Sequence, residues 1–288
     1  MTRPHDAPTG SSRTTTFQGF GGLQLAADEW LRSGQTVLML HGGGQNRHSW
    51  KKTGQVLADN GFHVIILDGR GHGDSEWASD GDYSIDAFTS DARAVVDQVG
   101  KPVVVVGASL GGMTGILLAR ILGPEKVIGL LLVDIVPRVE TVGTDRIRDF
   151  MSSGMEGFES LDEAAEAVAA YLPHRTKPRS PQGLTKNLRL RDGRWFWHWD
   201  PAFLANPENS PIGRTDEIKR AAAELAVPVL LIRGKLSDVV SQEGAEEFLR
   251  DVPTAEFAEL SGAGHTAAGD DNDAFSDAVL DFVKRVKS

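Results

Sequence analysis

Short apolar runs alternate along the chain with stretches of helical periodicity. The apolar runs occupy residues 36–40, 63–67, 103–106, 127–133 and 227–233. Continuous β-branched and aliphatic runs of this length are typical of strands buried on both faces of a parallel sheet. Amphipathic helical patterns separate them, at residues 49–60, 85–99, 110–122 and 244–250. This alternation predicts an α/β protein with a mostly parallel, doubly wound sheet and right-handed crossovers.

The two ends of the chain extend this pattern. Segments 14–20 and 23–30 flank Gly21-Gly22, and two glycines supply the positive φ angles of a tight turn, so we expect a β-hairpin there. Residues 1–13 are polar and rich in Pro, Gly, Ser and Thr, which predicts a disordered tail. Near the C-terminus we expect a strand at 254–260 and a last helix at 273–286.

The alternation breaks between residues 137 and 216, where only 162–172 has a helical pattern and no continuous apolar strand occurs. We interpret residues 137–216 as an insertion on one face of the sheet and call it the cap segment. Residues 14–136 and 217–288 then form the core domain.

An Asp-Gly pair at 192–193 lies between the alternating runs LRLR and RWFW, a strong hairpin signal inside the cap segment. Three tryptophans would share one face of this hairpin: Trp195, Trp197 and Trp199. Aromatic clusters serve both as small cores and as pocket walls, and the sequence leaves both interpretations open. His198 lies on the opposite face, where we expect a structural role.

The amino-acid composition limits the kinds of molecule that this protein is expected to bind. The formal net charge of −10 gives no basic surface for nucleic acid or anionic lipid. The absence of cysteine excludes disulfides, thiolate metal sites and a cysteine nucleophile. No apolar run approaches the roughly 20 residues of a membrane span, and no signal peptide is visible. We therefore expect a cytoplasmic protein, monomeric or dimeric, that acts on a small molecule.

Candidate chemistry lies at the turn after strand 103–106, which reads GASLG at 107–111. A G-x-S-x-G pattern between a strand and a helix is typical of a nucleophile elbow. Its glycines remove Cβ atoms that would collide in the tight turn. The hydroxyl of Ser109 would lie at a helix N-terminus, where free N–H groups favour negative charge. Ser109 is therefore the candidate nucleophile.

A serine nucleophile needs a base and an acid. His265 lies in a GAGH loop between the last strand and the last helix, from which it can reach the carboxyl edge of the sheet. Asp238, on the loop after the strand that follows the cap segment, gives the chain order Ser109, Asp238, His265, which fits this hydrolase architecture. Asp134, at the end of the preceding strand, is the alternative acid. We favour Asp238.

The run HGGG at 41–44 follows an early strand and predicts half of an oxyanion hole. Bare glycines let backbone N–H groups approach a substrate oxygen. We expect the N–H groups of Gly43 and Leu110 to be the two donors, with Gly44 as the second choice after Gly43.

These motifs resemble the α/β-hydrolase family, in its lid-bearing branch of esterases, lactonases, carbon–carbon bond hydrolases and cofactor-free perhydrolases. They are HGGG at 41–44, DGRGHGDS at 68–75, GASLGG at 107–112, GKLSD at 234–238 and GAGH at 262–265. The resemblance implies the α/β-hydrolase fold with a lid and a catalytic triad, and no metal or organic cofactor. Within the second motif, Asp68 is expected to cap a turn.

We expect a serine hydrolase that cleaves a carboxylic ester or lactone of a small, largely apolar substrate through an acyl-enzyme. Gly44, Trp195 and Trp197 are the candidate substrate contacts. Relatives that act on epoxides or haloalkanes carry Asp where Ser109 stands, which argues against those activities. Gly44 stands where perhydrolases usually have proline, which makes peracid formation a weaker possibility. Carbon–carbon bond hydrolysis by the same triad stays open, as does a receptor of this fold that binds its ligand with little turnover.

Overall fold

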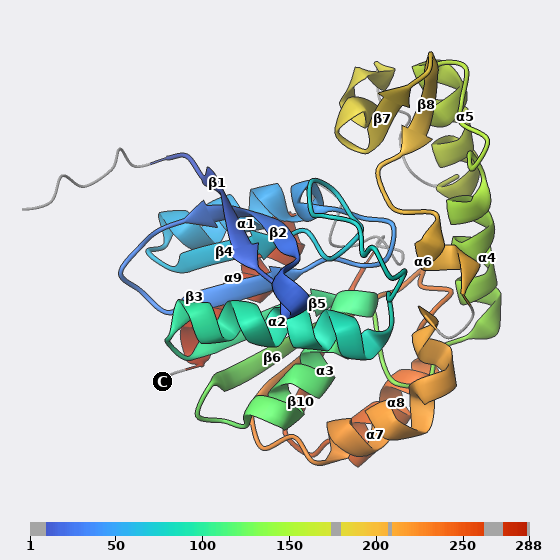
Figure 1. Cartoon of the computed structure of the whole chain (residues 1–288). Helices are drawn as coiled ribbons and strands as arrows, with labels where there is room; N and C mark the ends of the chain where they lie inside the picture. The colour runs from blue at the N-terminus through green and yellow to red at the C-terminus, as the bar shows by residue number, and fades with distance from the viewer. Residues whose placement is uncertain (1–9, 174–179, 207–208, 262–272, 287–288) are drawn as a thin grey trace, which may run out of the picture.

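The apolar runs form an eight-stranded sheet in the order β1-β2-β4-β3-β5-β6-β9-β10 (Figure 1). The computed structural model describes residues 10–173, 180–206, 209–261 and 273–286. The strands are β1 (Arg13–Gln18), β2 (Gln24–Trp30), β3 (Thr36–Leu40), β4 (His63–Leu67), β5 (Val103–Ala108), β6 (Val127–Val133), β9 (Val229–Gly234) and β10 (Ala255–Leu260). Only β2 runs antiparallel to its neighbours β1 and β4, whereas all other pairs are parallel. The mostly parallel sheet and the N-terminal hairpin are confirmed.

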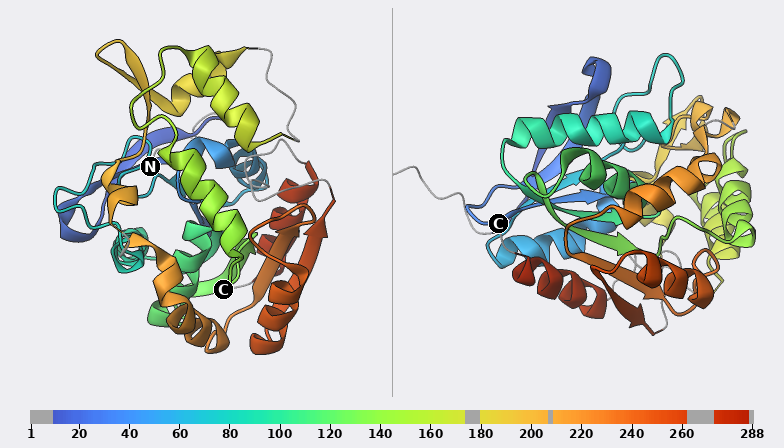
Figure 2. Two further views of the ribbon diagram at one scale, coloured as in Figure 1. Left: turned by 90° about the vertical axis from the view of Figure 1, so that its right-hand side faces the viewer. Right: turned by 90° about the horizontal axis from the view of Figure 1, so that it is seen from below.

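Helices cover both faces of this sheet (Figure 2). One face packs against α1 (Lys51–Asp59) and α9 (Asp273–Arg285), and the other against α2 (Ile85–Val99), α3 (Leu110–Leu122), α7 (Thr215–Ala223) and α8 (Gln242–Asp251). Successive side chains of a strand point to opposite faces. Accordingly Val103 and Val105 of β5 join the second layer, while Val104 and Val106 join the first. This two-sided burial is why the strand is a run of valines.

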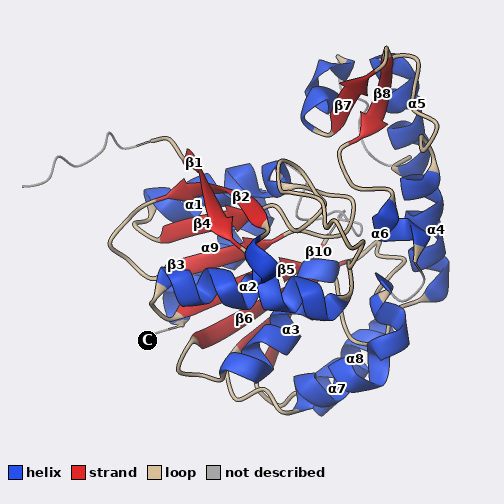
Figure 3. Cartoon of the chain, in the orientation of Figure 1, coloured by secondary structure: helices blue, strands red, loops and turns tan. Residues whose placement is uncertain are grey.

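The cap segment leaves the sheet after β6 and lies beyond the carboxyl ends of the strands (Figures 1 and 3). It contains α4 (Thr141–Ser152), α5 (Leu161–Tyr171), β7 (Leu188–Arg191), β8 (Arg194–Trp197) and α6 (Ala202–Ala205). The cap segment also contains the 3-10 turns η3 (Pro181–Lys186) and η5 (Pro211–Arg214), and the core contains η1 (Phe20–Gly22) and η2 (Arg47–Trp50). The cap segment has an apolar cluster of its own, formed by Met151, Phe158, Ala164, Leu188, Trp197 and Trp199.

The predicted hairpin in the cap segment is confirmed, because β7 and β8 pair antiparallel around Asp192 and Gly193. Both turn residues have positive φ, 49° and 79°, as a tight hairpin turn requires. Helix α4 was not expected from the sequence. Its packing explains it: a Cβ on Gly143 would lie 2.3 Å from the carbonyl oxygen of Asp238, so α4 rests directly on the loop after β9.

In the part of the chain that the structure describes, no helix combines the length and apolar character needed to cross a membrane.

Candidate active site

Ser109 occupies the sharp turn between β5 and α3. Its backbone has φ 48° and ψ −117°, a strained conformation for a residue other than glycine. Nearby backbone leaves no room for side chains at the motif glycines. A Cβ on Gly107 would lie 2.3 Å from the oxygen of Gly111, and one on Gly111 would lie 2.3 Å from the oxygen of Leu40. The turn therefore has the strained, crowded strand-to-helix geometry that the motif predicts.

The elbow lies at the base of a cavity of about 780 Å³ that the core and the cap segment enclose together. Most of its wall is apolar and comes from α3, α4, α5, the end of β8 and α6: Met113, Ile147, Phe150, Met151, Val168, Trp197, Trp199, Phe203 and Leu204. A volume of this size suits a small organic substrate. Gly43 and Gly44 also line it.

The cap tryptophans serve both predicted purposes. Trp197 and Trp199 stack with ring centroids 5.1 Å apart, belong to the cap cluster and line the cavity. Trp195 packs against that cluster from outside and is not among the cavity-lining residues that the structure describes. Trp197 therefore keeps its place as a candidate substrate contact, whereas Trp199 is the better second candidate.

The N–H groups of the three glycines in the loop after β3 differ in their hydrogen bonding. Gly42 N donates to Gln45 Oε1 at 3.1 Å, and Gly44 N donates to His72 Nε2 at 3.1 Å. Within the described residues, Gly43 is the loop glycine whose N–H has no acceptor. Leu110 is the first residue of α3, so no carbonyl of that helix accepts from its N–H. This geometry favours Gly43 over Gly44 as the partner of Leu110.

Two buried histidines hold this loop in place. His72 accepts from Gly44 N through Nε2, so its Nδ1 carries the proton and donates to Arg70 O at 2.9 Å. His41 likewise accepts from Gly69 N at 2.9 Å and donates to Gly42 O at 2.8 Å. Both rings are thus neutral and have a defined tautomer. Sequence reasoning missed this role of His72, although it lies in the quoted DGRGHGDS motif.

These histidines predict a loss of stability in acid. Burial lowers the pKa of His41 to about 4 and that of His72 to about 3. An unfolded histidine titrates near 6.5, so below that pH the unfolded chain binds more protons. The stability that each neutral ring contributes is present above about pH 6.5. It is lost as the pH falls toward 4, by up to about 1.4 kcal/mol per pH unit for each ring.

Urea unfolding at a series of pH values measures this slope. In His72→Gln, which removes one of the buried rings that stay neutral in the folded protein, the free energy of unfolding should fall less steeply between pH 6.5 and 4 than in the wild type. An equal slope in the two proteins would contradict the assignment.

The two candidate acids have different surroundings. Asp134 directly follows β6, whose last residue Val133 is paired with Ala108, so Asp134 and Ser109 end neighbouring strands. Asp134 is fully buried and has a φ of 49°. Its carboxylate accepts from Gly234 N at 3.0 Å and from Ser237 Oγ at 2.5 Å. Ser109 and Asp134 are thus two adjacent strained residues at the carboxyl edge of the sheet.

Asp238 instead faces the cap segment. Its carboxylate accepts from the Arg146 guanidinium of α4 at 2.8 Å, and about a third of its side chain is exposed. Arg146 also donates to the carbonyl oxygen of Tyr171 in α5. Asp238 therefore joins the loop after β9 to two cap helices. His265, the predicted base, lies outside the described residues.

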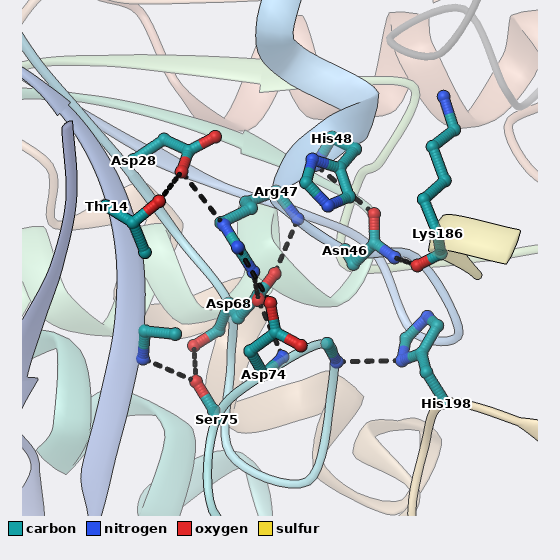
Figure 4. A network of polar contacts seen from close by, with 12 residues as sticks. Thr14, Asp28, Asn46, Arg47, His48, Asp68, Asp74, Ser75, Lys186 and His198 are labelled. Atoms are coloured by element: carbon teal, nitrogen blue, oxygen red, sulfur yellow. Dashed lines mark hydrogen bonds and ion pairs between the residues drawn. The ribbon is translucent and has the colours of Figure 1, made fainter. Parts of the chain in front are cut away.

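Beneath the site, Asp68 does more than cap a turn (Figure 4). The predicted cap is present, because Asp68 Oδ2 accepts from Asp74 N at 2.9 Å. The fully buried carboxylate also accepts from Arg47 N at 2.6 Å and forms an ion pair with the Arg47 guanidinium. Arg47 further contacts Asp28 at 3.1 Å and Asp74 at 2.8 Å. This buried network fixes the loops after β3 and β4 to each other.

Three comparisons relate the chain to known proteins. The model of the alpha/beta hydrolase family matches residues 37–278. Esterase Rv0045c of Mycobacterium tuberculosis is 31% identical over 233 residues, which cover 78% of this chain and 74% of that protein. The sn-1-specific diacylglycerol lipase ABHD11 of Mus musculus is 28% identical over 255 residues, covering 86% and 80%. A solved structure of the M. tuberculosis esterase matches with a TM-score of 0.77 at 27% identity, over 97% of this chain and 93% of that one.

Proposed function

The chain belongs to the α/β-hydrolase family, and we propose that within it the protein is a serine hydrolase that cleaves a carboxylic ester or lactone through an acyl-enzyme. The observation that carries this proposal is the strained Ser109 elbow, which opens into a largely apolar cavity beside the N–H groups of Gly43 and Leu110. The esterase and lipase relatives support ester chemistry in general.

In the proposed mechanism, His265 removes the proton from Ser109 Oγ, and Oγ attacks the substrate carbonyl carbon. The N–H groups of Gly43 and Leu110 donate to the oxyanion that develops. His265 then gives its proton to the leaving alcohol, and water, activated by the same histidine, hydrolyses the acyl-enzyme.

For the acid that orients His265 we propose Asp134 in place of Asp238. A triad acid has to be buried, ionised and fixed in direction. Two donors, Gly234 N and Ser237 Oγ, hold the buried Asp134 carboxylate beside the elbow. The Ser237 hydroxyl is itself fixed, because it accepts from Val240 N at 3.0 Å. Asp238 is engaged by Arg146, so it would have to leave that ion pair to serve.

A fluorophosphonate probe tests the nucleophile. The intact wild-type protein should gain the mass of one phosphonyl group and lose its activity toward p-nitrophenyl esters. Ser109→Ala should show neither the mass nor the activity. Ser33→Ala, which changes a serine in an exposed turn, should behave as the wild type. Labelling of Ser109→Ala, or its unchanged ester turnover, would refute the proposal.

A further inference from the structure

The cavity differs from the rest of the protein in charge. The chain has 40 acidic residues and a net charge of −10. Among the cavity-lining residues that the structure describes there is no Asp or Glu, whereas His48, Arg148 and Lys186 contribute to the wall. A cavity without carboxylates in an acidic protein has an electrostatic preference for substrates that are neutral or negatively charged.

A buried amide links the backbones of two of these residues. Asn46 is 1% exposed, and its Oδ1 accepts from His48 N at 3.2 Å. Its Nδ2 donates to Lys186 O at 3.0 Å and to Asn187 Oδ1 at 3.0 Å (Figure 4). One side chain thus connects His48 in η2 of the core to Lys186 in η3 of the cap segment. The two residues meet where core and cap segment join.

The polar ends of the His48 and Lys186 side chains are available to a ligand, whereas Arg148 is the weaker candidate. Arg148 has an acidic neighbour, with Asp145 at 3.9 Å. Within the described residues, Lys186 has no carboxylate partner and the His48 ring has no hydrogen-bond partner. Burial lowers the pKa of His48, and the Arg47 guanidinium and the Lys186 ammonium lower it further. Both residues line the same cavity, so one ligand there can contact the two.

We propose that His48 and Lys186 form a carboxylate subsite, so that the preferred substrate is an ester that carries a free carboxylate away from the bond that is cleaved. The Lys186 ammonium supplies one positive charge, which matches a single carboxylate, and the neutral His48 ring supplies an N–H donor. The apolar wall contacts the carbon chain between the two ends of the substrate. This inference rests on the proposed function of Ser109.

Matched pairs of substrates test it. One member of each pair is the mono-p-nitrophenyl ester of glutarate, adipate or pimelate, and the other carries a primary amide in place of the free carboxylate. For at least one chain length, the wild type should have a kcat/KM for the acid about tenfold or more above its kcat/KM for the amide. A difference of this size is expected for a charge-assisted hydrogen bond. Added salt should reduce this ratio.

Variants locate the preference. In Lys186→Gln and His48→Phe the ratio of acid to amide should fall toward one, whereas Lys186→Arg should keep it. Lys101→Gln removes the same charge just before β5, at the other end of the strands, and should keep the wild-type ratio. A wild-type ratio near one, or a ratio that survives both Lys186→Gln and His48→Phe, would overturn the subsite.

Binding to Ser109→Ala gives a readout that needs no turnover. By calorimetry, monomethyl adipate should bind more tightly than dimethyl adipate, and Lys186→Gln in the same background should abolish the difference. Equal binding of the two esters would refute the subsite. Loss of all ester turnover in the wild type, together with selective binding of the acid, would instead refute the proposed hydrolase function and leave the subsite standing.

Discussion

Asp134→Asn is expected to lower kcat for ester hydrolysis by about 10⁴-fold, the effect typical of replacing a triad carboxylate by its amide. The amide is nearly the same size, so the fold should persist. It removes the charge that, in the proposed mechanism, stabilises a protonated His265. The two donors contact different carboxylate oxygens, Gly234 N contacting Oδ1 and Ser237 Oγ contacting Oδ2, so the amide keeps only one of these two acceptors. Steady-state kinetics with a p-nitrophenyl ester measure the change.

Asp238→Asn is the matched control, since it removes the other candidate acid in the same way. It breaks the ion pair with Arg146 and acts only through the position of α4, so we expect kcat to fall by less than about tenfold. Circular dichroism should show both variants to be folded. The reverse ranking, with the large loss in Asp238→Asn, would return the role of triad acid to Asp238.

Asp68→Ala should lower the free energy of unfolding by about 3–5 kcal/mol, the usual cost of breaking a buried ion pair by removing one partner. The change leaves Arg47, whose side chain is 6% exposed, without its most buried counter-charge. It also removes the acceptor of two backbone N–H groups, those of Arg47 and Asp74. Chemical denaturation measures the loss.

Asp97→Ala provides the comparison on the surface. Asp97 also pairs with two cations, Lys126 and Arg93, but its side chain is 44% exposed. Exposed pairs contribute about 1 kcal/mol or less, so this variant should unfold nearly as the wild type does. Equal losses in the two variants would show that burial does not set the value of the Asp68 pair.

Much of the core could be predicted because its strands are buried on both faces. The predicted bounds of β3, β4 and β6 agree with the structure, since each is an unbroken apolar run. The bounds of α3 agree as well, because a glycine-rich elbow precedes this helix and Gly123 follows it. Helix α4 escaped prediction because it packs on the loop after β9 and in the apolar cluster of the cap segment, and its own residue pattern does not record these contacts.

The choice of acid could not be made from spacing alone. Asp134 and Asp238 both follow a strand at the carboxyl edge of the sheet, and chain order favoured Asp238. The two acids differ in burial and in their partners. The partners are remote in sequence: Gly234 and Ser237 for Asp134, and Arg146 for Asp238. The role of His72 was hidden for the same reason, because it depends on Gly44.

The separate apolar cluster of the cap segment has a consequence for protein engineering. Its members pack mainly on one another, while the strands and the elbow depend on the two clusters of the core. Substitutions at Phe150, Val168 or Leu204 should therefore reshape the acyl and alcohol space with little cost to the sheet. Libraries restricted to such positions would explore substrate range while the proposed nucleophile, acid and oxyanion donors stay constant.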